Sequence, residues 1–284
     1  MSIRLSSLTV EDVAAARGQL PRAFSATPQE RVKFWIFWGA NGALTLYCLY
    51  RFGFLSGDFL HGMAKFGSVV VAQLFPPAGW GHMPEFLKAM GETIAMAFIG
   101  TLLGAVFALP LSFLASRNMT RSRPVQFGTR RFADLLRAFD YLIWALIFVR
   151  AVGLGPLAGI MAIAIVETGT FIKLYSEAIE NLDRKQVDGI AAAGGNGLQR
   201  IRFGVLPQVL PVMLAQALYF FESNTRSAAI LGVVGAGGIG LQIAERIRVR
   251  HWDEVAFIIL LMIATVAAID WLSARLRRRL IGGR

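Results

Sequence analysis

The feature that most constrains this chain is a series of long apolar segments separated by shorter polar ones. A helix needs about 20 predominantly apolar residues to cross the roughly 30 Å hydrocarbon core of a bilayer. Six segments fit this description: Phe34–Phe54, Phe86–Ala115, Leu135–Val152, Leu157–Ser176, Gln208–Leu231 and Val255–Ser273. We therefore expect an all-α fold, a polytopic membrane helical bundle of about six transmembrane helices.

The composition agrees with a membrane protein and argues against other classes. The 284 residues are 55% hydrophobic and only 17% charged, with a mean hydropathy of +0.55. An average soluble domain is about 25% charged. These values argue against a soluble enzyme and against a disordered chain. Cys48 is the single cysteine, so the chain can form neither an intrachain disulfide nor a cysteine-based metal cluster.

The positions of lysine and arginine predict the orientation. Cytoplasmic loops of membrane proteins are enriched in these residues. If the N-terminus is cytoplasmic, 19 of them fall in the N-terminal tail, the loops after the second and fourth spans, and the C-terminal tail, against 4 in the outer segments. We therefore expect both termini to be cytoplasmic. This distribution accounts for most of the net charge of +11 without a nucleic-acid partner.

The segment after the first span predicts a short amphipathic helix that ends before Pro76 and Pro77. Its apolar residues recur at helical spacing: Phe59, Met63, Phe66, Val70 and Leu74. Such a helix either lies on the outer membrane surface or packs on the bundle. The sequence leaves these two alternatives open.

The loop at 177–206, after the fourth span, predicts two short helices. Ala191, Ala192 and Ala193 favour a helix, which Gly194 and Gly195 interrupt before a second one begins. Prolines follow near the start of the fifth span, where the first helical turn tolerates them. The loop therefore predicts a helical hairpin on the cytoplasmic side.

This hairpin carries a resemblance to a known family. The run Asp188-Gly-Ile-Ala-Ala-Ala-Gly194, followed by nine residues and Gly204-Val-Leu-Pro207, resembles the EAA loop of bacterial ABC importer permeases. The family pattern is Glu-Ala-Ala, three residues, Gly, nine residues, and Ile-x-Leu-Pro. Gly194 and Leu206-Pro207 match in register, whereas Asp188, Gly189, Ile190 and Gly204 depart from the pattern.

Further segments are similar to the phosphonate-import permeases within that family. These are Val152–Pro156, Gly204–Pro211, Phe221–Ser227, Gly232–Gly240 and the arginine-rich tail. The resemblance covers roughly residues 86–280. It implies a type I ABC importer permease fold in a bacterial inner (cytoplasmic) membrane.

The resemblance also implies a function and a set of partners. The chain is expected to be the permease subunit of an ATP-driven importer of phosphonate, which a periplasmic or extracellular binding protein delivers. Its expected partners are a second copy of itself (a homodimer), two ATPase subunits, the binding protein and membrane lipid. ATP and Mg are expected in the ATPase subunits, because this chain has no phosphate-binding Gly-x-x-x-x-Gly-Lys-Ser/Thr motif. No catalytic residue, cofactor or metal is expected in the chain itself, which is not predicted to be an enzyme.

The expected organisation has four parts. Residues 1–33 form a cytoplasmic tail, and 34–85 hold the first span with the outer amphipathic segment. Residues 86–275 form the core permease domain, with the coupling loop at 177–206, and 276–284 form a basic cytoplasmic tail. Within the loop and just after it, the residues expected to contact the ATPase are Asp188, Gly189, Ala192, Gly194, Leu206 and Pro207.

Charged residues within the spans are candidates for the translocation pathway or its gate. A charge at the centre of a span costs about 2.5–3.5 kcal/mol on insertion scales, so it faces a partner or water. Glu222 and Arg226 lie four residues apart and can pair on one helical face toward the expected outer end. Glu167 falls near the middle of the fourth span, and Arg150 near the end of the third. The glycine run that includes Gly237 and Gly238 predicts close backbone approach at an outer gate.

Several readings remain open. Arg150 and Arg226 can offer donors to an oxyanion, or Glu222 and Arg226 can form a purely structural pair. The cargo can instead be phosphite, hypophosphite or phosphate. An integral-membrane enzyme is a distant alternative, because such an enzyme needs clustered acidic or histidine side chains and here the acids are dispersed. A membrane scaffold without transport activity is a third class.

Overall fold

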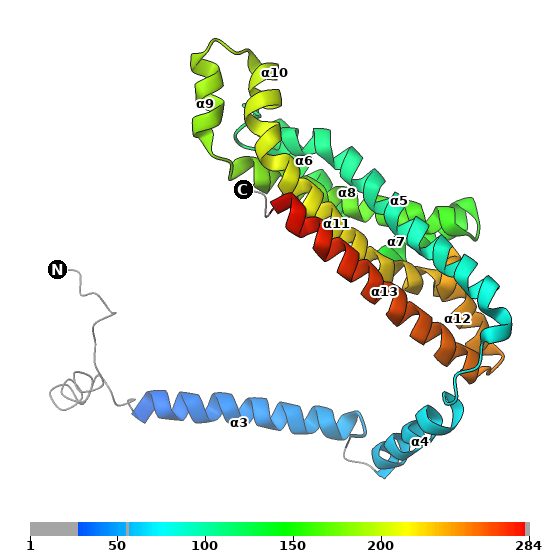
Figure 1. Ribbon diagram of the computed structural model, residues 1–284. Coiled ribbons are helices and arrows are strands. Elements are labelled where there is room, and N and C mark those ends of the chain that lie inside the picture. Colours follow the sequence, from blue (N-terminus) through cyan, green and yellow to red (C-terminus); the bar gives the residue numbers. More distant parts are fainter. Residues whose placement is uncertain (1–27, 55–56, 282–284) are drawn as a thin grey trace, which may run out of the picture. The chain divides into compact units, whose positions relative to one another are not determined.

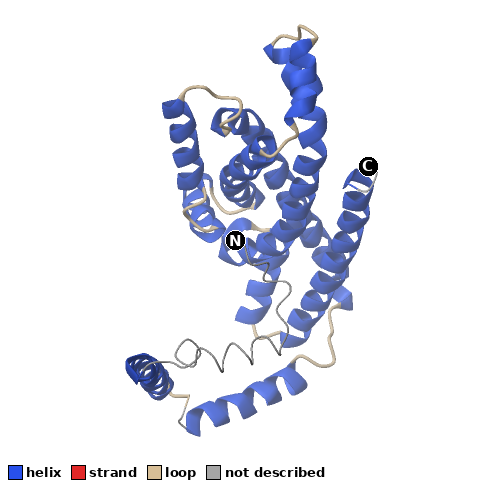
Figure 2. Cartoon of the chain, turned by 90° about the vertical axis from the view of Figure 1, so that its left-hand side faces the viewer, coloured by secondary structure: helices blue, strands red, loops and turns tan. Residues whose placement is uncertain are grey.

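The computed structural model describes residues 28–54 and 57–281, which form helices and connecting turns without a strand (Figure 2). The chain divides into two compact units, Met1–Val71 and Ala72–Arg284. The N-terminal tail expected at residues 1–33 lies largely outside the described residues. Each unit is considered by itself.

The first unit holds α3 (Pro28–Arg51) and most of α4 (Gly57–Gln73). No residue of α3 is buried. α4 coincides with the expected amphipathic helix and ends shortly before the prolines at 76 and 77. Phe59, Met63 and Phe66 are 41%, 55% and 64% exposed. These three apolar side chains thus remain available to lipid or to another chain.

The second unit is built on four long helices (Figure 1). They are α5 (Met83–Ala115), α8 (Pro156–Glu180), α11 (Leu206–Leu231) and α13 (Trp252–Ile281). The shorter elements are η2 (Trp80–His82), α6 (Arg123–Leu136), α7 (Tyr141–Val152), α9 (Arg184–Ala192), α10 (Gly197–Gln199), η3 (Arg200–Val205), η4 (Gly232–Ala236) and α12 (Gly238–Arg248).

The two ends of this bundle differ in structure. α9 and α10 stand beyond one end, which we call the α9 end, whereas α12 lies at the other, the α12 end (Figure 1). At the α12 end the backbone N–H of Gly155 donates to the carbonyl of Gly235, 3.0 Å away, and Ala78 N–H donates to Asp253 O at 3.3 Å. The turn between α7 and α8 therefore lies beside η4, and the chain before α5 lies beside the start of α13.

Four helical segments of the described chain are long and apolar enough to cross a membrane: Trp80–Ala115, Pro156–Glu180, Gly197–Ala236 and Trp252–Arg279. They correspond to the second, fourth, fifth and sixth expected spans. Tyr141–Val152 is apolar but shorter. α3, which covers most of the first expected span, is not among the four. An all-helical membrane bundle is confirmed, with a helix count roughly consistent with the expected six.

The third expected span, Leu135–Val152, differs most from the structure. It is not one helix, because α6 ends at Leu136 and α7 begins only at Tyr141. Asp140 caps α7, with a carboxylate oxygen that accepts a hydrogen bond from Leu142 N–H at 3.0 Å. α6 and α7 thus run along α8 as two half-length helices separated by a charged turn.

Close packing of α5 on α8 forms the centre of the bundle. Gly100 and Gly104 of α5 permit it: a Cβ on Gly100 would lie 2.7 Å from Ile163 Cβ, and one on Gly104 would lie 2.6 Å from Glu167 Cβ. Small residues at such positions allow the backbones of membrane helices to approach closely. This packing places Glu167 in the interior of the bundle.

Candidate coupling surface and translocation pathway

The loop at 177–206 folds into the expected pair of short helices. Asp183 caps α9, with a carboxylate oxygen 3.0 Å from Lys185 N–H. Gly194 then adopts φ +82°, a conformation that disfavours residues with a Cβ. The Gly195 N–H donates to Ile190 O at 2.9 Å and closes the turn. Asn196 and Gln199 cap α10 reciprocally, so local signals in the sequence define both ends of the turn.

The residues expected to contact an ATPase lie on and just after this hairpin. Asp188, Gly189, Ala192 and Gly194 are exposed. Leu206 is half-buried and Pro207 exposed, at the first turn of α11. Two large apolar side chains, Leu198 and Phe203, are also 78% and 58% exposed at the α9 end. The hairpin therefore offers a projecting surface with apolar residues.

Gly204, which departs from the family pattern, has a packing role. It is buried, and a Cβ there would lie 3.1 Å from Val187 Cα and 3.2 Å from Ile190 Cδ1. The missing side chain thus allows η3 to lie directly against α9. The departure at Gly204 preserves the hairpin instead of disrupting it.

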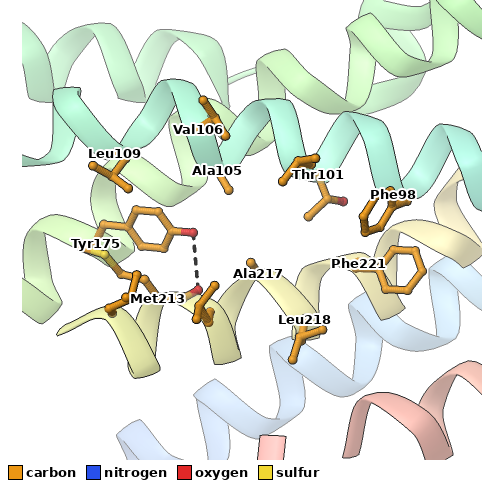
Figure 3. Close-up of a pocket in the computed structure, with 13 residues that line it drawn as sticks. Phe98, Thr101, Ala105, Val106, Leu109, Tyr175, Met213, Ala217, Leu218 and Phe221 are labelled. Carbon is orange, nitrogen blue, oxygen red and sulfur yellow. Dashed lines mark hydrogen bonds between the residues drawn. The ribbon is translucent and has the colours of Figure 1, made fainter. Parts of the chain in front are cut away.

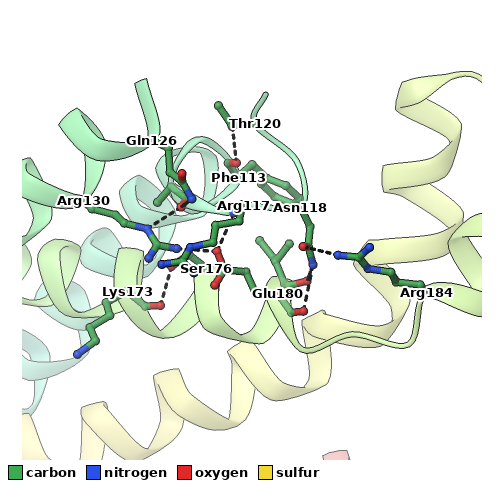
Figure 4. A network of polar contacts seen from close by, with 12 residues as sticks. Phe113, Arg117, Asn118, Thr120, Gln126, Arg130, Lys173, Ser176, Glu180 and Arg184 are labelled. Atoms are coloured by element: carbon green, nitrogen blue, oxygen red, sulfur yellow. Dashed lines mark hydrogen bonds and ion pairs between the residues drawn. The ribbon is translucent and has the colours of Figure 1, made fainter. Parts of the chain in front are cut away.

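A polar network ties the hairpin to the bundle (Figure 4). Glu180, at the end of α8, accepts hydrogen bonds from Arg117 N–H at 2.7 Å and from Arg130 Nη2 at 2.6 Å. Asn118 Nδ2 donates to the carbonyls of Ile179 and Glu180, and its Oδ1 accepts from Arg184 Nη2 at 2.8 Å. The first residue of α9 is therefore connected through Asn118 to both the α5–α6 turn and α8.

Glu167 lies in a fully buried polar centre. Its side chain has no solvent exposure, and its Oε1 accepts hydrogen bonds from Tyr141 OH and Asn224 Nδ2, each at 2.7 Å. Asn224 Nδ2 also donates to Thr101 Oγ1 at 2.9 Å. One carboxylate thus joins α5, α7, α8 and α11. Glu167 Oε2 and Asn224 Oδ1 are buried and have no hydrogen-bond partner among the described residues.

Glu222 and Arg226 form the expected pair, but each also binds α13. Arg226 Nη2 lies 3.8 Å from Glu222 Oε1, whereas Arg277 Nη2 lies only 2.9 Å from Glu222 Oε2. Arg226 Nη1 lies 3.4 Å from Asp270. Both partners belong to the second half of α13, so the pair joins α11 to α13.

The remaining predicted pathway residues lie at the α12 end. Gly237 and Gly238 adopt φ +80° and +68°, and a Cβ on Gly238 would overlap Thr93 Oγ1. Ile239 N–H donates to that hydroxyl at 2.9 Å, which fixes the glycine run against α5. Arg150 lies exposed in the last turn of α7. The predicted pathway residues therefore lie in the centre, between α11 and α13, and at the α12 end, and they do not form one cluster.

A further ion cluster at the α12 end was not expected from the sequence. Arg246 Nε donates to Glu254 Oε2 at 2.8 Å and its Nη2 lies 3.4 Å from Glu85. His82 and His251 also face Glu254, at 3.6 and 3.3 Å. This cluster joins α5, α12 and α13. Arg246 and His251 lie eight and three residues before Glu254 in the sequence, but their meeting with Glu85 depends on tertiary structure.

An apolar groove of about 320 Å³ runs between α5 and α11 (Figure 3). Phe98 and Phe221 meet edge to face at one end, with ring centroids 5.7 Å apart. At the other end Tyr175 OH donates to Met213 O at 3.4 Å. The described residues that line the groove include no charged side chain. It therefore provides no ion-pairing group for an anionic substrate.

The fold is a bundle of membrane-crossing helices with a projecting hairpin, and comparison with known proteins identifies the family. Residues 108–282 match the model of the family described as binding-protein-dependent transport system inner membrane component. The chain belongs to this family. It is thus an inner-membrane permease component.

Individual relatives confirm the resemblance to phosphonate-type permeases. The chain is 36% identical to the phosphite transport system permease protein PtxC of Stutzerimonas stutzeri, over 84% of this chain and 86% of that protein. It is 32% identical to the phosphate-import permease protein PhnE of Mycolicibacterium smegmatis, over 86% of this chain and 46% of that protein. A chain in the inward-facing structure of the MetNI methionine ABC transporter has the same fold, with a TM-score of 0.62 at 20% identity, covering 70% of this chain and 98% of that one.

Proposed function

We propose that this chain is the permease subunit of an ATP-driven importer that carries a small phosphorus oxyanion. Phosphonate is the preferred candidate for that anion. A binding protein delivers the anion at the α12 end, and two ATPase subunits dock at the α9 end. Both termini are cytoplasmic in this proposal, and the chain pairs with a second copy of itself. The chain binds no ATP and catalyses no reaction.

The observation that carries the proposal is the projecting hairpin. α9 stands beyond the bundle, and its Asp188, Gly189 and Ala192 are exposed. At its base, the bond between Arg184 and Asn118 connects it to α5 and α8. A force applied to α9 by an ATPase is therefore transmitted to the two central helices.

The proposed cargo rests on the relatives named for phosphite and phosphate transport. Phosphonate, phosphite, hypophosphite and phosphate share a tetrahedral phosphorus and anionic oxygens. Arginine is suited to such groups, because its planar guanidinium donates two parallel hydrogen bonds. The choice among these anions is left to the experiment.

The test uses the chain purified with its co-expressed ATPase and binding protein in lipid nanodiscs. ATP hydrolysis is measured against methylphosphonate, 2-aminoethylphosphonate, phosphite, hypophosphite and phosphate. Stimulation by the organic phosphonates supports phosphonate as the cargo, and stimulation by phosphite alone supports phosphite. If no ATPase assembles with the chain, the proposal is wrong and an integral-membrane enzyme becomes the leading alternative.

A substitution at Gly194 tests the role of the hairpin. Because Gly194 has φ +82° and nothing within 4 Å of a built Cβ, Gly194→Leu strains the turn without a steric clash in the core. We expect this variant to insert and assemble normally but to lose the stimulation of ATP hydrolysis by the binding protein. Gly128→Leu on α6, where a Cβ also meets nothing, is the matched control. Normal stimulation in Gly194→Leu would argue strongly against this coupling surface.

A further inference from the structure

The turn between α6 and α7 places charged groups at half the depth of the bundle. Val166 and Thr170 of α8 line a cavity at this turn. They lie roughly 15 and 21 Å from the start of a 25-residue helix, at 1.5 Å per residue. Between them, a Cβ on Gly169 would lie 2.6 Å from the carbonyl oxygen of Ala133 and 3.2 Å from Arg137 N. The end of α6 therefore packs against the middle of a membrane-crossing helix.

The cavity at this turn has a volume of about 800 Å³ and a charged lining. Asp134 holds two arginines: Arg131 Nη1 lies 3.0 Å from its Oδ2, and Arg137 Nη2 lies 2.8 Å from its Oδ1. Their side chains remain 64% and 35% exposed, and each guanidinium has further N–H groups beyond the one that Asp134 accepts. The other carboxylate in the lining, Asp140, caps α7.

A neighbouring cavity extends the same charge pattern. It shares Arg131, Asp134 and Arg137, and it adds Arg130, Lys173 and Glu177. Arg130 is paired with Glu180. Two arginines thus face two carboxylates, Asp134 and Asp140, in the first cavity, and the neighbouring cavity adds Lys173 and Glu177.

Exposed charges at this depth cannot face hydrocarbon without a large cost, so this side of the chain faces water or another protein chain. The turn also interrupts a membrane-depth helix. In transporters, broken helices of this kind bind anionic groups near the N-terminus of the second half, where the helix dipole is positive. Here α7 begins at the cavity, beside the two arginines.

We propose that the cavity at the α6–α7 turn is an oxyanion-binding site within the membrane. Arg131 and Arg137 donate to a phosphorus oxyanion in transit, and Asp134 is a positioning residue that holds both guanidinium groups. This inference rests on the proposed function and specifies where the permease contacts its cargo. The apolar groove between α5 and α11 does not provide such donors.

The first test measures the electrostatic character of the cavity without transport. Cys48→Ser removes the chain's one thiol, and Ala138→Cys places a new one at an exposed position in the cavity lining. The assembled complex is treated with two methanethiosulfonates, one anionic (sulfonatoethyl) and one cationic (trimethylammonioethyl). After correction for their intrinsic rates, we expect the anionic reagent to react at least about fivefold faster. Arg131→Gln and Arg137→Gln should abolish this preference, whereas Arg123→Gln, on the same helix outside the cavity, should retain it.

The second test measures uptake of phosphite and methylphosphonate into proteoliposomes that contain the complex with its ATPase and binding protein. We expect Arg131→Gln and Arg137→Gln each to reduce uptake at least about tenfold, with the ATPase subunits still assembled on the chain. Arg137→Lys should recover only part of the loss, because lysine cannot form the bidentate contact. Arg123→Gln should import normally.

The outcomes separate this inference from the function it rests on. A cysteine at position 138 that does not react, or that shows no preference for the anionic reagent, overturns the site whether or not the complex transports. A clear preference with unchanged uptake in both arginine variants also overturns it. If the wild-type complex imports neither anion, the proposed cargo is wrong. The thiol experiment still tests whether the cavity attracts anions.

Discussion

At the scale of single residues, Gly104 shows how the absence of a side chain defines the centre of the bundle. A Cβ there would lie 2.6 Å from Glu167 Cβ and 3.2 Å from the Glu167 carbonyl carbon, so backbone would have to move. Gly104→Ala should therefore destabilise the protein, since overpacking costs about 1–3 kcal/mol. The measurement is the unfolding temperature of the purified chain in detergent.

Gly91, on the same helix, provides the control for Gly104. It is exposed and a Cβ there meets nothing within 4 Å. Gly91→Ala should leave the unfolding temperature unchanged or raise it, because alanine favours a helix over glycine by about 0.5–1 kcal/mol. Equal behaviour of the two variants would mean that α5 and α8 do not pack as closely as described.

Substitutions at Asn224 and Thr101 separate the contributions of individual hydrogen bonds in the buried polar centre to the stability of the protein. Asn224→Ala removes the donor to both Glu167 and Thr101. Thr101 Oγ1 loses its donor while Glu167 Oε1 keeps the bond from Tyr141 OH, so we expect a cost of about 1–3 kcal/mol. Thr101→Val removes only one acceptor and should cost about 1 kcal/mol or less. We expect unfolding temperatures in the order wild type, Thr101→Val, Asn224→Ala. A larger loss in Thr101→Val than in Asn224→Ala would contradict this network.

The residues of this centre show what the sequence can and cannot predict. Glu167 stands out because a lone acid in an apolar span must find a partner. Asn224 and Thr101 do not stand out, since polar uncharged residues are common in spans and lie 57 and 66 positions away from it in the sequence. Which helical faces meet depends on how the helices pack, and a single sequence does not reveal that packing.

At the scale of elements, the hairpin and the break between α6 and α7 differ in how far they could be predicted. The hairpin follows from local signals, the alanines of α9 and the glycines after it, so both of its helices were expected. The break was missed because Leu135–Val152 is apolar enough to indicate one span. Asp140 was the available signal, since aspartate favours the N-cap position of a helix.

Arg184 connects the hairpin to the bundle, and its loss should loosen α9. Arg184→Ala removes the 2.8 Å bond to Asn118 Oδ1. We expect amide hydrogen exchange in α9 to rise by up to about tenfold, the effect of losing roughly 1.4 kcal/mol from a charge-assisted bond. Lys185→Ala, at the neighbouring exposed position, should leave exchange in α9 unchanged. If both variants exchange alike, Arg184 does not restrain the hairpin.

At the scale of the whole molecule, the positions of the charged side chains indicate which part of the chain faces water or another chain. The described part of the chain holds ion pairs in three further places: at the α12 end, between α11 and α13, and at the α9 end. In each of them an arginine pairs with a glutamate of the same chain. The arginines at the α6–α7 turn differ, because two of them share one carboxylate and remain exposed at half depth. An exposed charged cavity at that depth needs water or another protein chain beside it in place of lipid.

The number of permease chains in the complex is therefore a prediction of its own. We expect native mass spectrometry of the complex, with this chain as the single permease expressed, to show two copies of it with two ATPase subunits. The physical reason is that a second bundle covers the cavity at the α6–α7 turn and leaves a water-filled path between the two copies. Co-expression with a different permease chain, if the same operon encodes one, is the control. A stable complex with one copy of this chain and one of the other would show that a different chain supplies the second half of the pathway.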